Sequence, residues 1–93
     1  MPEPVRPAVV HLPRSLVALF PDCPRRLEAV GATVEAVVRD VDRRVPGFAN
    51  RVLDAGPSLR RHLNVYVAGE RAGLDTSVPP GADVHVIPAV SGG

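Results

Sequence analysis

The sequence of 93 residues predicts an α+β roll, in which a mixed sheet of roughly four to five strands is covered on one face by one main helix. Strand patterns open the chain, one amphipathic helix pattern follows, and the most regular strand patterns close the chain. A helix with a single apolar stripe needs a sheet to bury it. Because a chain of this length has room for one core, we expect one domain over 8–88, an unstructured lead-in at 1–7 and a flexible tail at 89–93.

The opening segment predicts two short strands. Ala8–Leu12 is apolar and β-branched, which is typical of a strand, and Pro13 ends it. The next run, Ser15–Phe20, fits either a second strand or a short helical turn. After a proline-flanked turn, Arg25–Val30 alternates as a short strand, and Gly31 closes it.

The helix is the clearest local prediction. Thr33 stands at the N-cap position, where its hydroxyl can accept a free amide of the first turn. One continuous apolar stripe then follows at helical spacing: Val34, Val37, Val38, Val41 and Val45. The opposite face carries acids and arginines, and we expect Asp40 and Asp42 to belong to a solvated charged face. Pro46-Gly47 ends the helix.

The closing segment predicts two or three strands. We expect 48–59 to be a connecting segment, pinned to the core by Phe48, Val52 and Leu53. His62–Ala68 is the clearest strand, with Asn64 and Tyr66 on the face opposite Leu63, Val65 and Val67. Gly69-Glu70 predicts a hairpin turn into a short strand near Arg71-Ala72, and Val84–Ile87 predicts the last strand. The first and last strands can pair in parallel at the centre of the sheet.

Composition argues against several classes of function. The net charge is +1 and three residues are aromatic, so neither a bulk positive field nor a stacking platform for nucleic acid is present. No segment has the pattern of a signal peptide or a membrane span, so we expect a cytoplasmic protein with no membrane partner. We expect Cys23 to be an incidental exposed thiol, and His11, His62 and His85 to be solvated strand residues that form no metal site.

The sequence ends in Ser91-Gly92-Gly93, directly after an apolar run. Glycines at such an end can lie in a narrow tunnel and present a bare carboxylate to the active site of another protein. A frayed terminus or a cloning remnant would explain the same residues.

These features together resemble a known family. An opening hairpin, a helix beginning at 31–34, the stop at Pro46-Gly47, the strand 63–67 and the ending 87–93 are similar to the ubiquitin-like sulfur carriers of the MoaD/ThiS family, and within it to the actinobacterial CysO type. The resemblance covers about Ala8 to Gly93 and departs at Ser91, where alanine is usual. It implies a ubiquitin-like β-grasp fold.

The resemblance also implies a mechanism without catalytic groups on this chain. An E1-like activating enzyme, using ATP and magnesium, would adenylate the carboxylate of Gly93, and a sulfur donor would convert it to a thiocarboxylate. A partner would then take the sulfur: a cysteine synthase, the large subunit of molybdopterin synthase, or a thiazole or thiosugar synthase. Gly92 keeps the approach slim, and the tail consists of Pro88, Ala89, Val90, Ser91, Gly92 and Gly93. The chain itself would bind no cofactor.

Two questions stay open at the level of sequence. Tyr66 is either a docking residue for the activating enzyme, since aromatic residues are enriched at interface hot spots, or an ordinary cross-strand contact. The alternatives to a sulfur carrier are a ubiquitin-like protein modifier conjugated through Gly93 and a non-catalytic interaction module.

Overall fold

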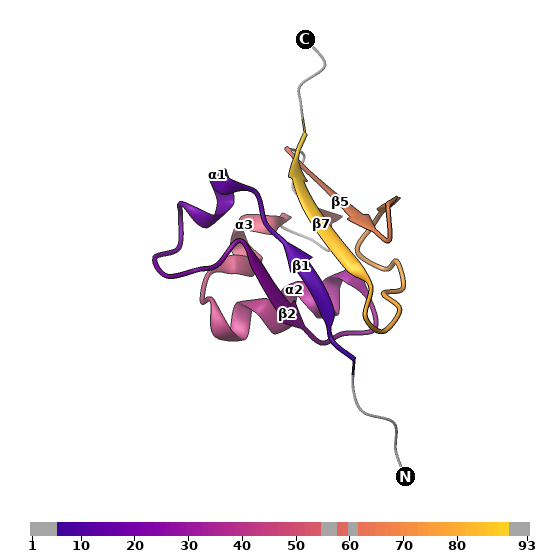
Figure 1. Cartoon of the computed structure of the whole chain (residues 1–93). Coiled ribbons are helices and arrows are strands. Elements are labelled where there is room, and N and C mark those ends of the chain that lie inside the picture. Colours follow the sequence, from indigo (N-terminus) through magenta and orange to yellow (C-terminus); the bar gives the residue numbers. More distant parts are fainter. Residues whose placement is uncertain (1–5, 55–57, 60–61, 90–93) are drawn as a thin grey trace.

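The computed structural model describes residues 6–54, 58–59 and 62–89, and these form a main sheet with the longest helix behind it in the view of Figure 1. The main sheet has five strands in the order β2-β1-β7-β5-β6. The strands are β1 (Ala8–His11), β2 (Arg26–Ala29), β5 (Leu63–Val67), β6 (Glu70–Ala72) and β7 (Asp83–Pro88). The number of strands and their mixed directions agree with the sequence prediction.

The centre of the sheet is the parallel pair of first and last strands, as predicted. Val10 of β1 lies opposite Val84 of β7, while β7 runs antiparallel to β5. Since β7 is flanked on both sides, its inward residues Val84 and Val86 are almost fully buried, at 2% and 4% exposure. The central strand of the sheet is therefore the one that leads directly into the C-terminal tail.

Helix α2 (Val34–Arg44) covers one face of this sheet and confirms the predicted helix. Thr33 is its N-cap, and its Oγ1 accepts a hydrogen bond from the Ala36 amide at 3.2 Å. Four of the five predicted stripe residues are buried, with exposures of 0% to 4% for Val34, Val37, Val38 and Val41. Val45 follows the helix as its C-cap and is only partly buried. Valine is a mediocre helix former, so burial of this stripe is the main source of the stability of α2.

The loop between β6 and β7 completes the start of α2. The carbonyls of Leu74 and Thr76 accept hydrogen bonds from the Glu35 and Val34 amides at 2.9 and 3.1 Å. These amides belong to the first turn of a helix, which lacks partners within the helix itself. The loop also buries Leu74 and Val78 against the core. It is thus part of the packed domain.

The segment between α2 and β5 contains structure that the sequence prediction left as a connection. A short helix, α3 (Phe48–Val52), is followed by β3 (Leu53–Asp54), which pairs with β4 (Ser58–Leu59) in a separate small sheet. Phe48 and Val52 are nearly fully buried, as expected of residues that pin this segment. Periodicity does not reveal a helix of a single turn, because it offers one repeat only.

The ambiguous opening run forms a short helix, α1 (Arg14–Val17), and not a strand. The Pro13 carbonyl accepts hydrogen bonds from the amides of Leu16 and Val17, so the proline, two residues after the end of β1, starts a helical turn. The hairpin turn after β5 centres on Ala68 and Gly69, which both have positive φ. The turn lies one residue earlier than predicted.

Across the described residues, no helix is both long and apolar enough to span a membrane.

Candidate functional site

The candidate site begins where β7 ends. The strand continues one residue beyond the prediction, through Pro88, which lies opposite Leu63 of β5. Ala89 follows, and its amide donates to the His62 carbonyl at 2.8 Å. The other tail residues named from the sequence (Val90, Ser91, Gly92 and Gly93) lie outside the described residues. The structure therefore anchors the root of the tail on β5.

Proline is accommodated at this position because no neighbouring strand needs its missing amide. Amides along an antiparallel strand alternate between its two edges, and the Ala89 amide faces β5. The Pro88 nitrogen consequently faces the other edge, where β1 has already ended at His11. Pro88 can thus end the ladder without leaving an unpaired donor.

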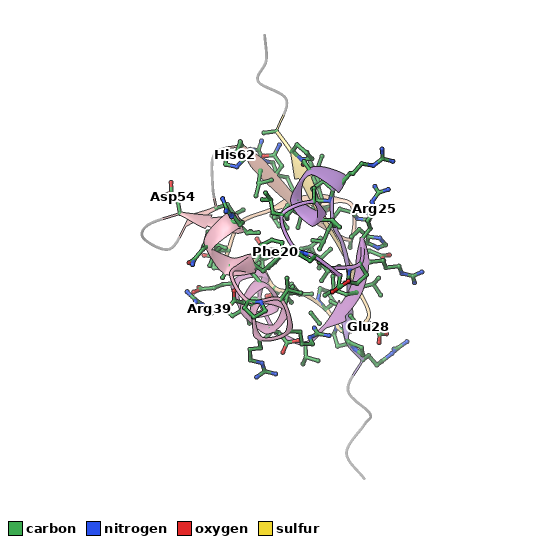
Figure 2. The ribbon with its side chains drawn as sticks, turned by 90° about the vertical axis from the view of Figure 1, so that its left-hand side faces the viewer. Phe20, Arg25, Glu28, Arg39, Asp54 and His62 are labelled. Atoms are coloured by element: carbon green, nitrogen blue, oxygen red, sulfur yellow. The ribbon has the colours of Figure 1, made fainter. Side chains whose placement is uncertain are left out.

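The sheet face opposite α2 carries a row of polar side chains across all five strands. The register pairs His11 with Arg26 and His85, and pairs Tyr66 with His85 and Arg71. The row therefore reads, from β2 to β6: Arg26, His11, His85, Tyr66 and Arg71. We call it the open-face row. Figure 2 shows the helix side with Arg39 and the sheet side with Glu28 on opposite sides of the molecule.

Tyr66 lies half-buried in this row, on the face predicted from the alternation of its strand. Its neighbour Arg71 donates to Asn64 Oδ1 at 3.1 Å, so the guanidinium is oriented by the same strand that carries Tyr66. The placement leaves Tyr66 accessible from the open face. Its role in docking stays a prediction.

The two histidines of the row form a contact that the sequence reasoning missed. Their rings stack with centroids 4.2 Å apart and planes inclined by 6°. His11 Nε2 also donates to Asp83 Oδ1 at 2.9 Å. This hydrogen bond is the main reason why the pKa of the Asp83 carboxyl lies below its ordinary value. The parallel pairing expected of the first and last strands brings these two strands together, but it does not fix the register that places His11 opposite His85.

Metal binding is a separate matter. Within the ranges that the structure describes, no group of three or more histidine, cysteine or acidic side chains is placed to hold a metal ion. His62 is exposed beside the root of the tail, whereas His85 lies opposite Tyr66, further along the strand that His62 precedes.

The prediction that Cys23 is exposed is wrong, since its residue exposure is 9% and it belongs to the core cluster. The Cys23 amide donates to the Phe20 carbonyl at 3.1 Å in a tight turn that directs the side chain inward. Cysteine packs as a small apolar residue in such a place. Burial raises the pKa of its thiol, which lowers the fraction of reactive thiolate.

The prediction of a solvated face is also wrong for the two helix acids. The Asp40 side chain is 13% exposed and accepts hydrogen bonds from the Val30 amide at 2.9 Å and from Arg44 at 3.2 Å. Asp42 accepts from the Ala49 amide at 2.9 Å, in the first turn of α3. Both carboxylates therefore fasten α2 to its neighbours.

Comparison with known proteins places this geometry in context. Residues 17–93 match the ThiS family. The sulfur carrier protein CysO of Mycobacterium tuberculosis is 33% identical over 75 residues, covering 74% of this chain and 81% of that protein. The CysO protein of Mycobacterium bovis is similar to the same extent.

Solved structures agree with the sequence relatives. A chain of the Amycolatopsis orientalis BexX/CysO complex superposes with a TM-score of 0.80 at 32% identity, covering 92% of this chain and 99% of that chain. Mycobacterium tuberculosis CysO gives 0.77 at 28% identity, covering 89% and 99%. SAMP1 of Haloferax volcanii gives 0.75 at 26% identity, covering 92% and 98%. These likenesses confirm the ubiquitin-like β-grasp fold expected from the sequence.

Proposed function

Because the chain belongs to the ThiS family of ubiquitin-like sulfur carriers, we propose that it carries sulfur as a thiocarboxylate on Gly93. One observation carries the proposal: the last strand of a CysO-like domain is followed in the sequence by Ser91-Gly92-Gly93. In this role the chain is a co-substrate. The matched relatives are themselves carrier proteins, in agreement with the prediction that the chain is not an enzyme.

The chemistry requires two steps supplied by other proteins. A carboxylate is a poor electrophile, so an E1-like enzyme joins Gly93 to AMP and releases pyrophosphate from ATP, with magnesium bound by that enzyme. A sulfide equivalent then attacks the acyl carbon, the bond to AMP breaks, and the thiocarboxylate forms. The new sulfur stays covalently attached until a partner enzyme takes it.

Anchoring the root of the tail supports this role. The hydrogen bond from the Ala89 amide to the His62 carbonyl holds the last described residue on the sheet, so the domain fixes the point at which the tail begins. Four residues beyond Ala89 reach about 13 Å when extended. An enzyme that acts at Gly93 must therefore contact the domain near this point, because the tail is too short to reach a deeply set active site from a distance.

The sulfur carried on Gly93 requires a partner enzyme that accepts it. The related chain in the BexX/CysO complex is bound to another protein, which supports docking of a CysO-like carrier on a partner. We propose a biosynthetic synthase as acceptor, of the cysteine, molybdopterin or thiazole and thiosugar class. Tyr66 is proposed to contribute to docking on the activating enzyme from the open-face row.

A second function, as a protein modifier, has one observation in its favour. SAMP1 of Haloferax volcanii, the small archaeal modifier protein 1, shares the fold at 26% identity. A modifier would use the same adenylate of Gly93 but pass it to a lysine of another protein. All 11 basic residues of this chain are arginine, so attachment to a lysine of a second copy is excluded.

Exchange of pyrophosphate with ATP tests the first step. With an E1-like enzyme and saturating carrier, we expect exchange with the wild-type chain and none after deletion of Gly93. We expect Tyr66→Ala to raise KM for the carrier about tenfold at an unchanged saturating rate, because it removes a docking contact and no reacting atom. Ser91→Ala serves as the matched tail control, which should behave as wild type. Full exchange by the deletion variant would refute adenylation at Gly93.

A further inference from the structure

A pocket lies at the end of the roll where the tail leaves the domain. Its volume is about 260 Å³, and it is bounded by Ser15, Leu16, Leu19, Arg51, His62 and Leu63. These residues come from α1 and the turn after it, from α3, and from the start of β5. Figure 1 shows α1 and the start of β5 at the same end of the molecule as the end of β7, and Figure 2 shows His62 there. The pocket is thus separate from the open-face row.

The walls combine an apolar floor with a basic rim. Leu16 and Leu63 are buried in the core and form the floor. Leu19 is 49% exposed and is one of the large hydrophobic residues that the described surface leaves open. Arg51 and His62 are exposed polar residues at the rim, and none of the lining residues is acidic. Such a site complements an apolar side chain that has a carboxylate next to it.

The pocket shares a residue with the anchor of the tail. His62, which lines the pocket, accepts the hydrogen bond from Ala89 through its carbonyl at 2.8 Å. An enzyme that reaches Gly93 over about 13 Å of extended chain must place the rim of its active site against this end of the domain. The surface of this domain that the enzyme contacts therefore includes the pocket.

We propose that this pocket receives an apolar side chain and an adjacent carboxylate from the activating enzyme that adenylates Gly93. The inference rests on the proposed function, because it is the short tail that brings this enzyme to the pocket. Leu19 and the leucine floor bind the apolar group, and Arg51 pairs with the carboxylate. The contact is made in the bound state before and during reaction, so it sets affinity and leaves the chemical step unchanged.

The test measures KM for the carrier in the pyrophosphate exchange reaction with two pocket variants, Leu19→Ser and Arg51→Gln. Each has a matched control away from the pocket. Val30 is 52% exposed, so Val30→Ser removes a comparable exposed apolar group at the end of the sheet opposite the tail. Arg39 pairs with Glu35 on the outer face of α2, so Arg39→Gln removes the same charge elsewhere.

We expect each pocket variant to raise KM about tenfold with kcat retained, while the controls stay within about twofold. We also expect added salt to raise KM for the wild type more steeply than for Arg51→Gln, because the variant lacks the charge that salt screens. Thermal unfolding of each variant checks that the fold is retained. Leu19 and Arg51 are exposed enough that neither substitution opens the core.

The failures of the two proposals are distinguishable. Normal exchange by the wild type together with an unchanged KM for both pocket variants overturns the pocket and leaves the carrier function standing. An equal rise of KM in the pocket variants and their controls overturns it as well, since the effect would not belong to this place. Absence of exchange with the wild type overturns the proposed function and the pocket with it.

Discussion

At the residue scale, the contact among Asp83, His11 and His85 shows how strand register creates an electrostatic arrangement. The carboxylate can only accept, so the hydrogen bond from His11 assigns a proton to Nε2 of that ring. The same bond favours the charged form of Asp83, which lowers its pKa in the folded state. The resulting stabilisation is present at pH values above the ordinary pKa of an aspartate and is lost as the pH falls through the lowered value.

Replacing His11 should therefore shift the titration of Asp83. We expect His11→Leu to raise the pKa of the Asp83 carboxyl toward its ordinary value, because the donor and its charge are removed. His11→Gln, which can still donate, should keep part of the shift, and His62→Gln, at the histidine outside the stacked pair, should leave it unchanged. The measurement is an NMR titration of the side-chain carboxyl carbon of Asp83. A midpoint in His11→Leu equal to that of the wild type would contradict this account.

The stacked histidines also show what single-residue reasoning could not supply. The sequence placed His11 and His85 on the first and last strands, and it predicted that those strands pair in parallel. It did not give the register, and a shift by one residue would have put the two rings on opposite faces. Cys23 was misassigned for a related reason, because its burial depends on how a turn folds back over the core.

At the element scale, α2 depends on a close approach at Gly31. A Cβ at this position would lie 2.6 Å from the Val37 nitrogen and 2.7 Å from the Ala36 carbonyl carbon. Both atoms belong to the backbone of α2, which cannot yield without moving the buried valine stripe. The glycine that closes β2 is thus a requirement of packing between β2 and α2.

We expect Gly31→Ala to lower the free energy of unfolding by about 1–3 kcal/mol, as overpacking of a tight contact does. Gly73→Ala is the matched control, since a Cβ there would have Asp75 Oδ1 at 3.6 Å as its nearest contact. The control should change stability by less than about 0.5 kcal/mol. Denaturant unfolding measures both. Equal losses in the two variants would show that the contact at Gly31 carries no special cost.

The elements differed in how far the sequence predicted them. Helix α2 and strand β5 were predicted well, because each repeats its apolar period several times and α2 has a threonine cap. Helices α1 and α3 are too short for a period, and the small β3–β4 sheet depends on pairing between segments of two residues. The pocket was not foreseen, since it forms between α1, α3 and β5 and exists only in the assembled fold.

At the scale of the whole molecule, the residues that stabilise the fold are different from the residues that are proposed to react. The core lies between α2 and the sheet, while the residues proposed to react follow the last core strand in sequence. The Gly-Gly ending was evident from the sequence and carried most of the functional prediction. The surfaces that would recognise a partner, the open-face row and the pocket, required the three-dimensional arrangement.

The most direct test of the central claim is the mass of the C-terminal peptide after incubation with an E1-like enzyme, ATP, magnesium and sulfide. Cleavage after Arg71 releases residues 72–93, which contain neither Met1 nor Cys23, so oxidation of those residues cannot imitate the exchange of oxygen for sulfur. We predict that this peptide gains the mass of one such exchange at Gly93, and that the gain disappears without ATP. An adenylated chain that never yields a peptide with the added sulfur would contradict the sulfur-carrier account.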